Sequence, residues 1–398
     1  MYLCITRDDL VRAGTSRANL ALFDTFSTRG VWEGKWTRLH AVWLAVGAPS
    51  LGQWLRALKL IPGADLRDVD LRRTDLRRAD LTLADLRRAD LREADLSDTS
   101  MAGADLRGSI LGSAIMRRTN LSAQLIGAST AGLAVKKAHV RRADLRGAVL
   151  TGADLNLADL RRADLREADL TDAYMAGADL RDALMGRARL SADLSGADMS
   201  GAVLRDAHLR RAILLRTVLR GADLSFADLH HADLREADLS DAILSGANLR
   251  GAILRGAVLR RTRLSADLLG ADLTGAVLRD AHLDRAMMRR ALLTSTDLRN
   301  ARLHLADLRR ADLTGADLSA DLSGADLRRA NLVGACLRSA DLTGADLRRA
   351  DLFGADLTDA DLTSSSLYRA NLRGTTMSEE QRAYARSEGA LVEDAAAA

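Results

Sequence analysis

Apolar residues recur along most of this chain with a period of five. From residue 64 to residue 377 the sequence repeats a unit of alanine, aspartate and leucine followed by two polar or small residues, as in "ADLRRADLREADLSD" from Ala84. Sixty-four such units follow one another, with leucine at the third position of 54 and alanine at the first position of 53. A period of five fits neither a helix nor a strand. Each unit is therefore predicted to combine a very short strand with a turn.

The positions within a unit predict which side chains are buried. In extended backbone the first and third residues share one face, and the aspartate between them points the other way. The fourth and fifth residues are mostly Arg, Ser, Thr, Gly or Asp, which suit a corner where the aspartate accepts backbone N–H bonds. A unit this small buries its apolar face only if the chain coils on itself, so the sequence predicts an all-β solenoid.

The tandem A-[DN]-L-x-x motif resembles the pentapeptide-repeat family over about four fifths of the chain. The resemblance implies a right-handed, four-sided β-helix with one unit on each side, so that 64 units form about 16 coils. At roughly 4.8 Å between neighbouring strands, the coils would extend for about 75–80 Å. The best-known members are acidic rods that mimic DNA, bind gyrase or topoisomerase IV and protect the enzyme from poisons. In relatives the C-terminal end often mediates dimerisation.

The chain is predicted to have three parts: residues 1–63, the β-helix of residues 64–377, and residues 378–398. The first part holds all four tryptophans, and from Gly34 its spacing is helical, with Trp36 and Trp43 able to share a face. We expect a cap over the open edge of the first coil. The alternative is a docking or membrane-surface segment.

The C-terminal part is predicted to be a capping helix followed by a tail. Ser378 can act as an N-cap with Gln381 three residues later, and Gly389 can end the helix. A homodimer through a terminal cap is possible.

Four places break the period by one residue. In "RLSADL", Arg189 to Leu194, two leucines stand only four residues apart. The same step occurs at residues 120–125, 263–268 and 317–322. The lost residue is the corner residue and both inward positions survive, so we expect continuous coiling with a tighter turn. The steps belong to a duplicated block of 14 or 15 units. Neither number is a multiple of four, so successive blocks should start on different sides.

Charge is nearly balanced, with 58 basic and 54 acidic residues and a net charge of +4. Arginine pairs follow aspartates, which predicts a solvated lattice of ion pairs whose neighbouring stripes largely cancel. A nucleic-acid binder normally separates the signs, so direct nucleic-acid binding is not expected, and an acidic protein or a lipid stays as an alternative partner. Examples of these arginine pairs are Arg72–Arg73, Arg77–Arg78, Arg87–Arg88 and Arg161–Arg162.

The sequence predicts no catalytic, cofactor-binding or metal-binding residue, no small-molecule substrate and therefore no enzyme. A convex solenoid spreads its polar side chains apart, whereas catalysis needs them to converge. His139, His208 and His282 occupy equivalent outward positions, and they could bind a metal only if they stacked on adjacent coils. We expect surface histidines there and at His230 and His231.

These observations favour a non-catalytic scaffold that binds a protein partner. The alternative is a DNA mimic that binds a type II topoisomerase, but assigning the units to four sides in rotation gives no strongly acidic side. Cys4 and Cys336 are too few for a disulfide framework and lack metal-ligand spacing. The N-terminus lacks a secretory pattern, and the apolar window of residues 39–55 is interrupted. A cytoplasmic location is expected.

Overall fold

The computed structural model describes residues 2–6, 31–35, 66–115 without 75, 80, 102, 112 and 113, then 142 and 145–392. Strands β1, Tyr2–Thr6, and β2, Val31–Lys35, pair antiparallel with Tyr2 opposite Lys35. The sequence analysis did not predict these strands in residues 1–63. The stretch predicted to be helical begins with Gly34; its first two residues lie in β2, and the rest lies outside the described residues.

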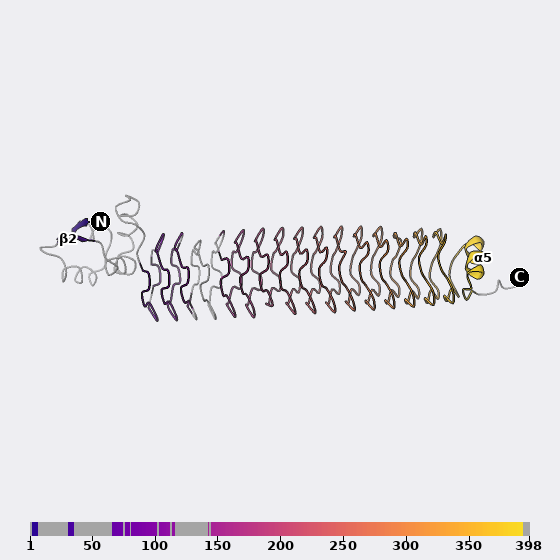
Figure 1. The fold of residues 1–398 in the computed structure, drawn as a ribbon, viewed down its shortest axis with the longest axis horizontal. Helices are drawn as coiled ribbons and strands as arrows, with labels where there is room; N and C mark the ends of the chain where they lie inside the picture. The colour runs from indigo at the N-terminus through magenta and orange to yellow at the C-terminus, as the bar shows by residue number, and fades with distance from the viewer. Residues whose placement is uncertain are drawn as a thin grey trace. The chain divides into compact units, whose positions relative to one another are not determined.

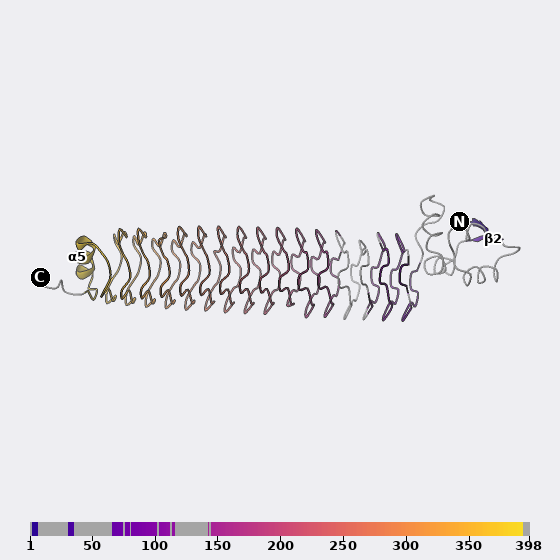
Figure 2. The ribbon, with the colours of Figure 1, turned by 180° about the vertical axis from the view of Figure 1, so that it is seen from behind.

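The repeats form a four-sided β-helix, because each strand residue pairs in parallel with a residue four units later. The chain divides into two compact units, residues 1–184 and residues 185–398. In the first, Asp70 pairs with Asp90. In the second, Asp233 pairs with Ile253. Four units per turn give four sides, as predicted, and the β-helix is right-handed. Figures 1 and 2 show the coils from opposite faces.

Leucine and alanine fill the interior of both units. Leu165 and Ala168 in the first unit and Leu234 and Ala237 in the second are fully buried. The aspartate that lies between the alanine and the leucine of one repeat is partly exposed, as at Asp164 and Asp233. Burying two aliphatic side chains in most repeats provides the hydrophobic stabilisation of this fold, which has few aromatic residues to bury.

Each corner is a hydrogen-bonded turn with its fifth residue in the left-handed region. Ala237 donates its N–H to the carbonyl oxygen of Leu234 at 3.1 Å, and Glu236 between them has φ 57°. Glycine takes this conformation without strain, as at Gly275 with φ 65°. The fold nevertheless places arginine, aspartate and even Phe226 there, so the repeating coil imposes the conformation on residues that disfavour it.

The four-residue steps tighten a corner and leave the core intact, as predicted. At the step in residues 189–194, the N–H of Ala192 donates to the carbonyl oxygen of Leu190 at 2.7 Å. This bond joins residues two apart, whereas the bond at an ordinary corner joins residues three apart. Leu190 and Leu194 are both fully buried. The steps at 263–268 and 317–322 also keep their leucines buried, and the step at 120–125 lies outside the described residues.

Helix α5, Glu379–Ser387, closes the second unit (Figure 1). Ser378 and Gln381 form the predicted capping box, and Gly389 follows the helix with φ 77°. The side chain of Gln381 donates to the carbonyl oxygens of Leu357 at 2.9 Å and of Ala360 at 2.7 Å. The Leu357 carbonyl oxygen also accepts the backbone N–H of Ala360 at 3.0 Å, whereas no backbone donor of the described residues reaches that of Ala360, so the helix supplies this carbonyl with its partner.

Candidate interaction surface

The outward aspartates hold the corners, as the sequence predicted. In the second unit, Asp326 accepts the backbone N–H of Arg328 at 3.2 Å and its side-chain Nε at 2.8 Å. These bonds, together with the charge of Asp326, raise the pKa of Arg328 above its ordinary value. Burial opposes ionisation of Asp346, but hydrogen bonds from Arg348 hold the pKa of that carboxyl below its usual range. Many arginines of the lattice are therefore already paired with the aspartate of their own five-residue repeat.

Fifth-position residues of successive coils often pair with opposite charges. Arg216 lies 2.7 Å from Glu236, and Arg261 lies 2.7 Å from Asp241. The first unit repeats the pattern, with 2.8 Å between Arg73 and Glu93. These pairs confirm the predicted lattice over much of the surface. They are exposed, so each contributes little to stability.

One side of the second unit departs from this balance, and we call it the basic side. It includes the bridged residues from Arg189 to Ser366, each paired with the equivalent residue of the next coil, together with the corner residues that follow each of them. It carries thirteen arginines and five aspartates. The arginines are Arg189, Arg210, Arg211, Arg250, Arg289, Arg290, Arg309, Arg310, Arg328, Arg329, Arg348, Arg349 and Arg369, and the aspartates are Asp228, Asp267, Asp307, Asp326 and Asp346.

The other three sides of residues 185–377 are slightly acidic. They carry four arginines against six acidic residues, six against eight, and five against six. The prediction that no side is strongly acidic is therefore confirmed for the second unit. The prediction that neighbouring stripes cancel is wrong on the basic side. Residues that share a side are 19 or 20 apart in sequence, so the charge of a side is the sum over such residues and not over adjacent five-residue repeats.

The basic side is most uniform over its last five coils, where the fifth positions form what we call the arginine ladder. The ladder consists of Arg290, Arg310, Arg329, Arg349 and Arg369. All five are exposed, and none forms an ion pair with a carboxylate of the described residues. Arg369 lies over the ring of Tyr368, with 5.3 Å between its Cζ and the ring centroid.

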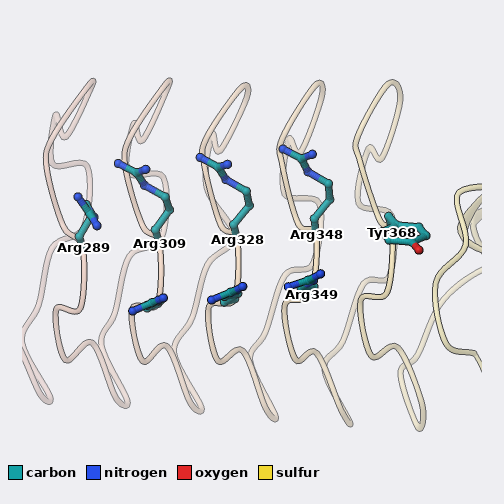
Figure 3. A pocket seen from close by; sticks show the side chains of 8 residues that line it. Arg289, Arg309, Arg328, Arg348, Arg349 and Tyr368 are labelled. Carbon is teal, nitrogen blue, oxygen red and sulfur yellow. The ribbon is translucent and has the colours of Figure 1, made fainter.

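A second row of arginines, which we call the inner row, runs beside the ladder. It consists of Arg289, Arg309, Arg328 and Arg348. Figure 3 shows the last three in the same conformation on successive coils, with Tyr368 at the end of their row and Arg349 in the row beside them. The two rows line a shallow groove of about 480 Å³.

The inner row is largely neutralised by aspartates. Arg328 pairs with Asp326 of its own unit, and its Nε also lies 3.4 Å from Asp346 on the next coil. Arg309 bridges Asp307 and Asp326 in the same way. The uncompensated positive charge of the groove therefore lies mainly on the arginine ladder.

The histidines and the described cysteine show no metal site. His208 and His282 lie on different sides, in the ladders Arg189–His208–Asp228 and Arg263–His282–Arg302, so block-equivalent residues fall on different sides as predicted. The rings of His230 and His231 lie 4.1 Å apart, and each bonds a backbone carbonyl of the next coil. Cys336 is a free thiol. His139 lies outside the described residues, and within those residues no three potential ligands gather around a common point.

A family model decides the classification. The model for pentapeptide repeats, eight copies long, matches residues 63–122 and 136–379 through overlapping segments. The chain is a pentapeptide-repeat protein. A comparison with curated proteins finds no match. Among the described residues of this pentapeptide-repeat protein, no helix is both long and apolar enough to cross a bilayer.

Several solved structures of pentapeptide-repeat proteins are similar to this chain. HetL from the cyanobacterium Nostoc, described as involved in heterocyst differentiation regulation, is 38% identical over 57% of this chain and 92% of its own, with a TM-score of 0.22. A pentapeptide-repeat protein from the cyanobacterium Cyanothece is 28% identical over 32% of this chain and 64% of its own, with a TM-score of 0.19. QnrB1, described as a plasmid-mediated fluoroquinolone resistance protein, is 19% identical over 55% of this chain and 95% of its own, with a TM-score of 0.23.

The sequence analysis missed the basic side of this pentapeptide-repeat protein, although a signal was present. Arg289, Arg309, Arg328 and Arg348 recur at intervals of 20, 19 and 20 residues, which are the lengths of a full coil and of a coil with one shortened corner. Adding the charges of residues at that interval, with the shortened corners taken into account, identifies the basic side. Comparing the charges of repeats that are adjacent in sequence does not identify it.

Proposed function

We infer that this protein is a non-catalytic scaffold that binds a protein partner on the outer surface of its β-helix. The observation that carries the proposal is the basic side, where a fixed main-chain lattice presents thirteen arginines against five aspartates. A surface that is ordered and strongly charged on one side suits recognition of a complementary partner. Its side chains spread over a convex surface, which does not suit the converging groups of an active site. A cytoplasmic location stays a prediction.

The alternative function is that of a DNA mimic that binds gyrase or topoisomerase IV. Duplex DNA carries one negative charge per roughly 1.7 Å of its axis. In residues 185–377 no side has more than two acidic residues in excess. This charge distribution favours the scaffold over the mimic. A gyrase supercoiling assay with and without a fluoroquinolone tests the choice: we expect neither inhibition nor protection at micromolar protein, and either effect would establish the mimic instead.

The scaffold is tested by chemical cross-linking of the full chain in extract from its own source. We expect a dominant partner protein whose cross-links map to the second unit, and no such cross-links to a chain denatured before mixing. Cross-links only between copies of this chain would instead favour the homodimer through a terminal cap, which light scattering measures separately. The absence of any cross-linked partner would contradict the proposed function.

A further inference from the structure

The arginine ladder stacks like charges, whereas at Arg216 and at Arg261 the fifth position stacks against an acidic residue. Arg310 donates its backbone N–H to the carbonyl oxygen of Arg328, and Arg329 donates to that of Arg348, so the coils fix neighbouring ladder positions one strand spacing apart. Guanidinium groups carried on backbone this closely spaced repel one another. At the equivalent positions Arg216 and Arg261, an acidic residue on the adjoining coil removes this repulsion.

The ladder therefore weakens the isolated fold. On the basic side, the five coils from Arg289 to Arg369 carry nine arginines and three aspartates, and those aspartates pair with three arginines of the inner row. An arrangement that breaks a local rule of charge pairing is expected at a functional site, where stability is given up for binding. A bound anionic partner would supply the missing charge.

Exposed apolar side chains lie at both ends of the ladder. Met287 precedes Arg289 and Arg290 on the basic side and is 50% exposed, and Leu292, the first outward residue of the neighbouring side, is 41% exposed. At the other end, Tyr368 is 52% exposed. Arginine, methionine and tyrosine are enriched at protein–protein interfaces relative to other surfaces. The surface thus combines charge with apolar anchors.

We propose that the arginine ladder binds an extended acidic segment of a partner protein, laid along the stacked coils. The inference rests on the proposed function and specifies the chemistry of its partner. Four strand spacings of roughly 4.8 Å make the ladder about 19 Å long, which matches about six residues of extended chain. Each guanidinium offers a planar set of donors that suits a carboxylate. The apolar anchors would contact the ends of the segment.

Single-stranded nucleic acid is the competing polyanion, and the surface suits it less well. Proteins that bind single strands combine positive charge with aromatic side chains on which successive bases stack. The basic side offers a single aromatic residue with a large ring over these five coils, Tyr368, and Arg369 already lies over that ring.

The test measures binding of a fluorescein-labelled decaglutamate peptide to the full chain by fluorescence anisotropy at 50 mM salt. The ladder variant carries Arg310→Glu, Arg329→Glu and Arg349→Glu. The matched control carries Arg216→Glu, Arg261→Glu and Arg285→Glu, which change the same number of charges at fifth positions of other sides. Glu93 and Glu236 occupy fifth positions with φ 60° and 57°, so the corner accepts glutamate. Variants with glutamine at the same sites provide a second set that keeps similar side-chain length.

We expect the ladder variant to lose binding by about tenfold or more and the control by less than about twofold. The glutamine variants should show the same order with smaller losses, and 200 mM salt should weaken wild-type binding. Equal losses in ladder and control variants, or no peptide binding by the wild type, would overturn the proposal. Tighter binding of a labelled ten-nucleotide oligothymidylate than of the peptide, lost only in the ladder variant, would assign the ladder to nucleic acid instead.

The outcome is separable from that of the proposed function. If the ladder variant still cross-links to the same partner as the wild type, the protein is an interaction rod that uses another side, and only the ladder assignment fails. If neither protein cross-links to a partner, the proposed function itself fails.

Discussion

The backbone N–H of Arg310 donates to the carbonyl oxygen of Arg328 on the next coil, at a distance of 3.1 Å. The same bond joins Arg329 to Arg348 and Arg349 to Tyr368. Main-chain bonds between corners therefore set the spacing of the surface arginines, and the side chains need no contacts of their own to stay in line. This separation of scaffold from surface allows the corner residues to vary without loss of the fold.

Inserting one glycine between Ser191 and Ala192 should leave stability nearly unchanged, within about 0.5 kcal/mol. The insertion restores the ordinary corner Leu-Ser-Gly-Ala that the chain already uses at Leu194–Ala197. It lengthens one coil from 19 to 20 residues, the length of its neighbours. Urea unfolding followed by circular dichroism measures the change.

A glycine inserted between Ser195 and Gly196 is the control. It creates a six-residue step and disturbs the bond from the Gly196 N–H to the Leu215 carbonyl oxygen, now 2.8 Å long. This variant should lose about 1–2 kcal/mol. Equal losses in the two insertions would show that the shortened corner is itself required.

Gly246→Ala should destabilise the fold more than Gly275→Ala. Both glycines have positive φ, so each substitution costs about 1 kcal/mol of backbone strain. A Cβ on Gly246 would also lie 2.6 Å from the ring of Phe226, whereas one on Gly275 meets nothing within 4 Å. Because Phe226 is exposed and can move, the additional loss should be only about 0.5–1 kcal/mol. Adding Phe226→Ala should abolish the difference in urea midpoints, and a difference that persists would place its origin elsewhere.

Ser365→Ala should stabilise the protein by about 1 kcal/mol. Ser365 occupies the buried first position of its unit, and its hydroxyl has no hydrogen-bond partner. Removing an unpaired buried polar group recovers its desolvation penalty. Thermal unfolding measures the gain.

Thr296→Ala is the matched comparison and should lower stability by about 1 kcal/mol. Its hydroxyl donates to the carbonyl oxygens of Leu293 at 2.6 Å and of Leu273 at 3.2 Å. The two substitutions introduce the same residue at the same position of the repeat, so opposite signs would follow from the hydrogen bonds of Thr296 together with its buried methyl group. Thr296→Val, which replaces the hydroxyl with a methyl group, should also lose stability if the hydrogen bonds matter. A loss in both variants would contradict this account of Ser365.

The carboxyl group of Asp70 should titrate at unusually low pH. Hydrogen bonds from the side chain and backbone of Arg72 lower the pKa of Asp70 from 3.8 to about 2. A carboxylate whose pKa is lower in the folded state stabilises the fold above its unfolded pKa. That contribution is lost as pH falls through the folded value, here between about 3.8 and about 2. Carbon-13 titration of the aspartate carboxyls should place Asp70 near 2 in the wild type. In Arg72→Gln the pKa of Asp70 should rise toward 3.8 but stay below it, because the backbone N–H of residue 72 still donates to the carboxylate. An unshifted wild-type value would refute the pairing.

The sequence by itself determined the unit of this protein. Alanine and leucine two residues apart require one buried face, and the aspartate between them with a glycine-tolerant fifth position requires a corner. The capping box at Ser378 and the tightened corner at Leu190–Leu194 were also predictable, because both depend on residues within one short segment. These are local relations, which residue type and spacing are enough to specify.

Only the tertiary structure decided which units share a side. Arg310 and Arg329 are 19 residues apart in sequence, yet they are neighbours on the surface because the N–H of Arg310 donates to the carbonyl oxygen of Arg328 on the next coil. A shortened corner moves the interval from 20 to 19 and changes which distant charges align. The strands β1 and β2 were not predicted for a similar reason, since Tyr2 pairs with Lys35 from more than thirty residues away. Charge balance over the whole chain therefore says little about charge on one face, because the fold sums residues by coil and not by sequence.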